Sequence, residues 1–354
     1  MNKLILYSHV NSWHISRNLS LFEELGYECR MFRWLDRDFF RRPFAVYLNW
    51  YESVKVGNII ATWTKFLLHI ITLRYAKFTG IKIIASFHNK EPHNNAHPRM
   101  ANYLFDLVFH LADRIVIFNE GGRTDLKRYL TEKEIEEKAV CIPPVSYIGA
   151  YPYVRHEWIA NVQEKQGMKI LMAGTLSQSY KNAEMLMDIA AELKDKDIEF
   201  VFAGKTKGEK QTALFEEKTK GLIHVTTAFR YVEDNEMAHL LEMCDVLIIP
   251  YNVESINNSG TARMAFSYGR TVICPRIPSL EAIPEELVYE YEYRNHEDHR
   301  HVLKQQILTA YNEWQNNHES LHQKGERLKH LMEENNSPEV VKERYRQLFN
   351  SLEK

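Results

Sequence analysis

The sequence predicts an α/β protein made of two doubly wound domains. Short apolar runs alternate with segments of helical periodicity, which is typical of parallel sheets covered by helices on both faces. The alternation stops at residues 142–152, a stretch with Pro and Gly, and then starts again. The 354 residues also exceed one ordinary core, so we expect two domains.

The first domain is expected over residues 1–155. Its first helix, at 14–26, places Leu19, Phe22 and Leu25 on one face and ends at Gly26. Two further helices are expected around 52–79 and 97–112. The predicted strands are the apolar runs 3–8, 45–50, 82–87 and 114–118.

The second domain is expected over residues 165–335. A helix is predicted at 182–194, and the tail from about 295 is helical and charged. The last helix is expected at about 337–354 and has apolar residues at helical spacing, which suits docking on another part of the chain. The predicted strands are 168–174, 198–204, 245–251 and 271–275.

Composition and charge exclude several classes of protein. With 45% hydrophobic and 26% charged residues, the chain has a globular composition. The longest apolar stretch, 59–73, contains Lys65 and His69 and falls short of the roughly 20 residues that span a bilayer, so a buried or interfacial helix is expected. The amino terminus is too short and polar for a signal peptide, and no nucleic-acid-binding motif is present.

Charge and cysteine usage indicate the surroundings of the protein. Residues 1–150 carry 20 basic and 15 acidic side chains, whereas the remainder carries 25 and 32. In the segment Arg30–Phe44, Arg residues are mixed with Trp and Phe, which suits either an anionic membrane surface or a solvated loop with aromatic anchors. Four well-separated cysteines predict free thiols and a cytoplasmic protein, with peripheral contact at the inner face of the membrane as an option.

Small residues stand where a predicted strand meets a predicted helix, in NSGTARMAFSYG (258–269). A helix amino terminus offers unpaired N–H groups and a positive dipole end, both of which attract phosphate. Gly260 would allow close approach, and Ser259 and Thr261 would add hydroxyl donors. The alternative is an ordinary helix capped by one of these hydroxyls.

Two lysines follow other strand ends of the second domain. Lys181 comes after a strand that ends at Gly174, and Lys205 comes directly after the next strand. Either lysine could place a positive charge on a diphosphate, or could simply be solvated.

A polar loop follows a strand in the first domain and reads SFHNKEPHNNAHP (86–98). His88 could act as a base or a hydrogen-bond donor near neutral pH. His88, His93 and His97 have a spacing that suggests zinc, but Pro92 and Pro98 interrupt any helix and no fourth ligand is evident, so no metal is expected.

Taken in order, these segments resemble the GT-B glycosyltransferases, and within them the retaining enzymes around glycosyltransferase family 4 that assemble bacterial polysaccharides. The likeness spans roughly residues 45–285. It is carried by NWYES (49–53), FHNKEPH (87–93), LADRIVIFNE (111–120), AGTLSQSYKN (173–182), FAGK (202–205) and PYNVESINNSGTARMAFSYGRTVICP (250–275).

The resemblance implies two Rossmann-like domains facing a central cleft and an enzyme of the hexosyltransferase type. It also implies that the last helix, about 337–354, packs back on the first domain. The second domain would hold a nucleotide-diphosphate sugar, and a glycan or lipid-linked acceptor would bind the first. No cofactor or metal is implied, and transfer would proceed with retention. The residues implied are His88, Glu254 and Lys181 for catalysis; Gly174, Lys181, Lys205, Ser259, Gly260 and Thr261 for the diphosphate; and Asn11, Asn89 and His93 for the acceptor or cleft.

The sequence departs from the family pattern at two places. Many relatives carry an Arg shortly before the phosphate-turn lysine, where this chain has Ser177, Gln178 and Ser179; Arg263 or Arg230 could supply that charge. Met264 stands where many relatives have a Glu. Two alternatives therefore stay open: a sugar-nucleotide epimerase, or an inactive glycosyltransferase-like binding protein.

Overall fold

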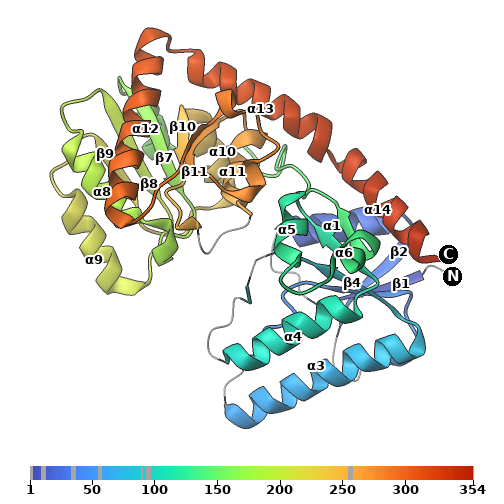
Figure 1. Ribbon diagram of the computed structural model, residues 1–354. Helices are drawn as coiled ribbons and strands as arrows, with labels where there is room; N and C mark the ends of the chain where they lie inside the picture. Colours follow the sequence, from blue (N-terminus) through green and yellow to red (C-terminus); the bar gives the residue numbers. More distant parts are fainter. Residues whose placement is uncertain are drawn as a thin grey trace. The chain divides into compact units, whose positions relative to one another are not determined.

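The computed structural model divides the chain into two compact units (Figure 1). Unit 1 comprises Met1–Val145 and Asn335–Lys354, and unit 2 comprises Ser146–Glu334. The first unit therefore ends before residue 155, where the sequence led us to expect its end. The structure describes residues 3–8, 13–32, 37–54, 58–88, 91–92, 97–253 and 258–353.

The sheet of unit 1 is parallel throughout, in the strand order β2-β1-β3-β4-β5-β6. Successive side chains of a strand point to opposite faces, and both faces are buried. In β4, Ile83 and Ala85 enter one apolar cluster while Ile84 enters the other. The strands are β1 Lys3–Tyr7, β2 Tyr27–Met31, β3 Ala45–Leu48, β4 Lys82–Ser86, β5 Arg114–Ile117 and β6 Ala139–Cys141.

Helices cover both faces of this sheet. Side chains of α1 and the carboxyl-terminal α14 form one cluster, and side chains of α3, α4 and α6 form the other. The helices of unit 1 are α1 Trp13–Glu24, α2 Arg37–Phe40, α3 Ile59–Thr79, α4 Pro98–Leu111, α5 Gly121–Leu126, α6 Glu132–Lys138 and α14 Pro338–Glu353.

The sheet of unit 2 repeats this design in the order β12-β11-β10-β7-β8-β9, again with parallel pairing throughout. Its strands are β7 Met168–Ala173, β8 Ile198–Ala203, β9 Val225–Ala228, β10 Val246–Ile248, β11 Thr271–Pro275 and β12 Tyr289–Tyr291. Its helices are α7 Glu157–Gln163, α8 Ala183–Glu192, α9 Gly208–Thr219, α10 Asp234–Met243, α11 Gly260–Ser267, α12 His296–Asn316 and α13 Ser320–Asn336, of which the last runs into the start of unit 1's closing segment.

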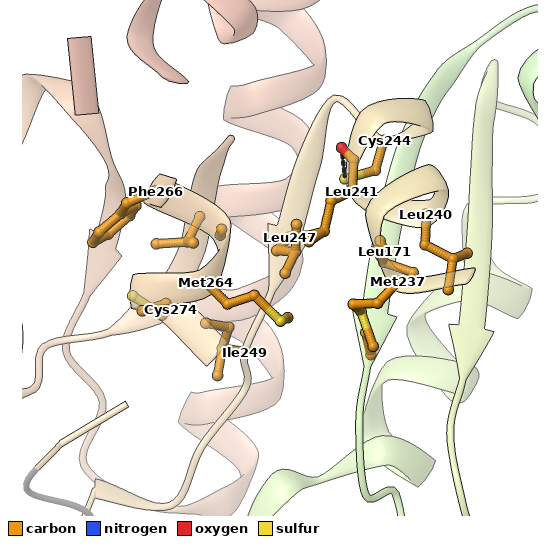
Figure 2. Packing of buried hydrophobic residues seen from close by; sticks show 14 of the residues in the cluster. Leu171, Met237, Leu240, Leu241, Cys244, Leu247, Ile249, Met264, Phe266 and Cys274 are labelled. Atoms are coloured by element: carbon orange, nitrogen blue, oxygen red, sulfur yellow. Dashed lines mark hydrogen bonds between the residues drawn. The ribbon is translucent and has the colours of Figure 1, made fainter. Parts of the chain in front are cut away.

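One apolar cluster of unit 2 explains why the chain has Met264 at the position where many relatives have Glu. Met264 of α11 is buried and extends into a cluster that includes Leu247 and Ile249 (Figure 2). A carboxylate at this position would be buried among apolar side chains, which is costly without a partner. Met264 is therefore a core residue of this protein.

The predicted fold class is confirmed, and the differences from prediction are local. The helix expected from residue 52 begins at Ile59, because Asn58 caps it by accepting a hydrogen bond from the Ala61 amide at 2.8 Å. The sequence prediction missed β2, β6, β9 and β12, which are the outermost strands of the two sheets. Within the described residues, no helix combines the length and hydropathy that a bilayer crossing requires.

A buried chain of hydroxyl groups fastens α14 to the sheet of unit 1. The Tyr345 and Tyr47 hydroxyl oxygens lie 2.9 Å apart, and Asn18 Nδ2 donates to the Tyr345 hydroxyl at 2.9 Å. Ser86 Oγ donates to the Tyr47 hydroxyl at 2.9 Å. Around this chain, Val341, Leu348, Phe349 and Leu352 of α14 are buried in the apolar cluster of α1.

We expect Tyr345→Phe to lower the free energy of unfolding by about 1–3 kcal/mol, because the Asn18 and Tyr47 groups lose a buried partner. Thermal unfolding measures the change. Tyr153→Phe is the control, since Tyr153 is 52% exposed. Equal melting temperatures for the two variants would show that this hydroxyl chain contributes nothing.

Candidate functional site

Both sheets reverse strand order at an internal position, which is where open parallel sheets bind ligands, beyond the carboxyl ends of their strands. In unit 2 the reversal lies between β7 and β10, and in unit 1 it lies between β1 and β3. The loops that leave these four strands are therefore the first places to look for a site.

The turn after β7 is built on two glycines. Gly174 has φ of +98°, a left-handed conformation that favours glycine. A Cβ on Gly204, at the end of β8, would lie 1.6 Å from the Gly174 carbonyl oxygen, so only glycine fits there. The Lys205 carbonyl oxygen then accepts from the Leu176 and Ser177 amides at 2.9 and 3.1 Å. Main-chain packing thus holds the turn in place.

This turn carries a buried ammonium group. Lys181 closes the short 3₁₀ helix Ser179–Lys181 and is 7% exposed. A Cβ on Gly174 would lie 3.4 Å from its Nζ, so the amine lies directly over the turn. Burial lowers the pKa of Lys181 to about 8, and no acidic side chain of the described residues pairs with it. A buried cation without a protein anion is a candidate for binding a ligand anion.

The amino terminus of α11 is the second part of the unit 2 site. Ser259 is the N-cap, and its Oγ accepts from the Ala262 amide at 3.1 Å, so the capping alternative holds for this hydroxyl. Gly260 and Thr261 are the first helical residues, whose amides have no acceptor inside a helix. Gly260 has no left-handed φ, and a Cβ there would meet only the Tyr147 hydroxyl at 3.4 Å. Protein packing alone therefore does not demand this glycine.

Hydrogen bonds bring the Lys181 turn and the α11 terminus together. The Asn252 amide donates to the Tyr180 carbonyl at 2.7 Å, and Asn182 Nδ2 donates to the Pro250 carbonyl at 2.7 Å. The Tyr251 hydroxyl donates to Thr261 Oγ1 at 3.3 Å. The predicted residues Gly174, Lys181, Ser259, Gly260 and Thr261 thus lie around the β7–β10 reversal.

The structure distinguishes the two arginines that could supply a second positive charge. Arg230 forms a bidentate pair with Glu236, with N–O distances of 2.7 and 2.5 Å, and this pairing lowers the pKa of Glu236 to about 2. The charge of Arg230 is therefore already compensated. Arg263 lies one turn into α11 beside Tyr147, and it forms no ion pair with the acidic side chains that the structure describes.

Lys205 belongs to a neighbouring surface. Its side chain is exposed and lines an open hollow of about 590 Å³ together with Phe229, Arg230 and Tyr231. Its main chain supports the Gly174 turn, and the same residue lines this hollow.

The strand ends of unit 1 present uncharged hydrogen-bonding and aromatic groups. Ser8, after β1, donates its hydroxyl to the Asn49 carbonyl at 2.9 Å and accepts from the Asn49 amide at 2.8 Å. Asn49 is buried, and its Oδ1 lies 2.8 Å from His88 Nε2. Since this amide oxygen can only accept, His88 Nε2 is the donor of this hydrogen bond.

Aromatic rings hold the His88 imidazole from several sides. The Trp50 ring stacks on it with centroids 4.0 Å apart, and Phe118 lies at 4.9 Å. Trp50 has φ of +46°, which is unusual for a bulky residue. Such strain is typical of functional sites, because the surrounding structure must maintain it.

The sequence analysis missed Asn49, Trp50 and Tyr251 as site residues. Asn49 and Trp50 are the last two residues of the predicted strand 45–50, whereas the observed β3 ends at Leu48; polar and aromatic residues at the end of an apolar run are the signal that could have found them. Four predicted site residues lie outside the described residues: Asn11, Asn89, His93 and Glu254. In the described part of the chain, no three His, Cys, Asp or Glu side chains lie close enough together to bind a metal ion.

Comparison with known proteins defines the class. Residues 167–301, all in unit 2, match the family model described as Glycosyl transferases group 1. Two relatives from Xanthomonas campestris pv. campestris, each named GDP-mannose:glycolipid 4-beta-D-mannosyltransferase, are 24% and 23% identical over 256 and 255 residues. Each alignment covers 70% of this chain and 67% of the relative.

Solved structures share the fold over the whole chain. A glycosyltransferase from Rickettsia africae covers 100% of this chain and 99% of its own, with a TM-score of 0.70 and 14% identity. HepE from Anabaena, solved with UDP and glucose, covers 99% of this chain and 100% of its own, with a TM-score of 0.69 and 9% identity. At such identities the likeness shows the fold alone.

The chain has the fold of the GT-B glycosyltransferases, and its unit 2 is similar to the group 1 glycosyltransferases. The resemblance found in the sequence is thereby confirmed: the chain is an enzyme similar to the group 1 glycosyltransferases.

We expect Lys181→Met to raise the melting temperature at pH 7 by about 2–4 °C, the shift that about 1 kcal/mol produces in a domain of this size. The folded chain releases the Lys181 proton near pH 8, whereas the unfolded chain holds it up to 10.5. Unfolding therefore takes up a proton between these values, and stability rises with pH through this window. In the variant, the part of this pH-dependent rise in stability that comes from Lys181 should be absent.

Thermal unfolding of wild type and variant between pH 7 and 10.5 measures both effects. Lys205→Met is the control, because it removes an exposed lysine. If Lys181→Met melts lower than wild type at every pH, the ammonium group stabilises the free protein. Lys181 would then not need a ligand anion as its partner.

Proposed function

We propose that this glycosyltransferase moves a sugar from a nucleotide-diphosphate donor to a glycan or lipid-linked acceptor in the assembly of a cell-surface polysaccharide. The observation that carries the proposal is the buried Lys181 ammonium over the Gly174 turn, beside the α11 terminus. A diphosphate supplies the negative charge that the described protein groups do not. Its leaving oxygen would be stabilised by charges already in place, which is how preorganised sites lower a barrier.

In this proposal the donor diphosphate is held by fixed groups and not by a metal. Lys181 compensates one charge, the amides of Gly260 and Thr261 donate to phosphate oxygens, and Arg263 is the second cation. Lys205 lies within the neighbouring hollow and would contact the nucleotide from there. Glu254 keeps its proposed role at the donor hydroxyls or the anomeric centre, on the family resemblance alone.

Unit 1 is proposed to bind the acceptor. His88 is proposed to act at the reacting sugar, since it lies just beyond the end of β4 and its ring is oriented by the Asn49 hydrogen bond and the Trp50 stack. Asn11, Asn89 and His93 are proposed acceptor contacts, again from the resemblance.

The relatives suggest candidates for both substrates. The named activity of the Xanthomonas relatives uses GDP-mannose and a glycolipid, and the HepE structures contain UDP or UDP-glucose. We propose a guanosine or uridine donor, a glycolipid acceptor, and retention of configuration. Nuclear magnetic resonance of the anomeric proton in donor and product tests the last point.

We expect a nucleoside diphosphate to raise the melting temperature, and the matching nucleoside to leave it unchanged, because the proposed contacts are to phosphate. Thermal shift with UDP, GDP, ADP and their nucleosides identifies the base. In Lys181→Met the affinity should fall about tenfold or more, since a charge-assisted hydrogen bond is lost. In wild type the affinity should decline above about pH 8, where binding must first reprotonate Lys181.

Gly260→Ala and Lys218→Met are the companion variants. Gly260→Ala keeps the charge and should melt like wild type, yet bind the diphosphate more weakly, because a methyl group would occupy the approach to the α11 amides. Lys218 is paired with Asp188 and should have no effect. If no nucleotide raises the melting temperature of the folded protein, the donor-site proposal fails.

We expect His88→Ala to lower the transfer rate by about 10²-fold or more, the usual contribution of a positioned acid or base, with nucleotide affinity unchanged. Transfer to a glycolipid acceptor and the thermal shift with nucleotide measure the two quantities separately. His110→Ala, an exposed histidine of α4, is the control. Full transfer activity in His88→Ala would remove His88 from the mechanism.

A further inference from the structure

Helix α3 of unit 1 exposes an apolar face that the glycosyltransferase fold does not explain. The face consists of Ile60, Trp63, Leu67, Ile71 and Phe78, which are 50–90% exposed. Their spacing of three, four, four and seven residues places them along one side of the helix. The opposite side is buried, with Thr62, His69, Leu73 and Ala76 facing the protein. Apolar side chains therefore occupy both sides of this helix.

Neighbouring aromatic residues extend this α3 apolar face. Trp63 contacts Phe66, and Phe66 contacts the half-exposed Tyr103 of α4, each with ring centroids 5.8 Å apart. Helix α4 runs beside α3 (Figure 1). The segment Arg30–Phe44 contributes Phe40, which is half-exposed and lies 5.5 Å from the Tyr75 ring of α3. Contiguous exposed apolar surface of this kind marks an interaction site.

The charges along the helix indicate what covers the face. Between Asn58 and Gly80 the sequence has Lys65, Arg74 and Lys77, and no Asp or Glu. Lys77 is ion-paired with Asp113, just before β5, at 2.7 Å. Arg74 is exposed and stands in line with Ile71 and Phe78. Apolar side chains flanked by cations, with Trp and Tyr among them, fit the interface of an anionic bilayer, where long basic side chains reach the headgroups.

We propose that the α3 apolar face docks unit 1 on an anionic lipid surface. A second copy of the chain suits the face less well. A two-fold interface would bring α3 against its own copy, and the helix offers no carboxylate to pair with the facing cations. The proposal revises the expected contact through Arg30–Phe44: Arg30 is ion-paired with Glu28 and Asp38, and Phe39 is buried.

This inference rests on the surface of unit 1 and not on the transfer reaction proposed above. Its test is flotation of the full chain with vesicles of phosphatidylcholine, alone or mixed with phosphatidylglycerol. We expect wild type to float with the mixed vesicles and to dissociate as salt is raised. Leu67→Glu combined with Ile71→Glu should weaken binding about tenfold or more, because two side chains lose their burial in the interface.

Two control variants test whether vesicle binding depends on the α3 apolar face and not on exposed apolar residues in general. Leu214→Glu combined with Ile223→Glu changes two exposed apolar residues of unit 2 and should float like wild type. Arg74→Gln should weaken binding to the mixed vesicles about fivefold. The nucleotide thermal shift of the Leu67 and Ile71 variant should equal that of wild type, so failure of the donor-site proposal would not alter the vesicle result.

Several outcomes would overturn the proposal. Wild type that stays unbound with phosphatidylglycerol vesicles contradicts it directly. Equal flotation of the Leu67 and Ile71 variant places the contact elsewhere. Sedimentation showing a wild-type dimer that the same variant dissociates would assign the face to a second copy of the chain.

Discussion

Parallel pairing of the described strands is the constraint on which the rest of this structure depends. Parallel neighbours need crossover connections, so helices cover both faces of each sheet and the strands become apolar on both sides. The same pairing collects every carboxyl end at one end of its sheet. The groups at that end of the sheet are therefore presented by a few loops, and in unit 2 those loops carry Gly174, Lys181 and the start of α11.

Close main-chain approach at these loops explains how an unfavourable cation is tolerated. Gly174 and Gly204 allow the ends of β7 and β8 to approach closely. This approach fixes the main-chain turn against which the Lys181 amine lies. The large apolar clusters on both faces of the sheet supply the stability that a buried, uncompensated ammonium removes. Lys181, which has no acidic partner among the described residues, differs in this way from Arg230, whose charge is already compensated by Glu236.

The central strands and the residues that follow them could be predicted from the sequence. The contacts between residues of different strands could not. The missed strands β2, β6, β9 and β12 lie at the sheet edges, where one side lacks a neighbour and the apolar signal is weak; β2, for instance, reads YECRM and is largely exposed. Lys181 and His88 could be found because each follows a strand. The pairing of Asn49 with His88, and of Tyr251 with Thr261, depends on which strands are neighbours, and no local pattern encodes that order.

The two units share one architecture, and they differ in the side chains that follow their strands. Around the β1–β3 reversal of unit 1, the described groups are an imidazole, an amide, a hydroxyl and aromatic rings, which suit an uncharged, hydroxyl-bearing ligand. Around the β7–β10 reversal of unit 2, a lysine and a helix amino terminus suit an anion. Because a diphosphate needs the second kind of site and a sugar hydroxyl the first, a donor in unit 2 and an acceptor in unit 1 is the assignment that electrostatics favours.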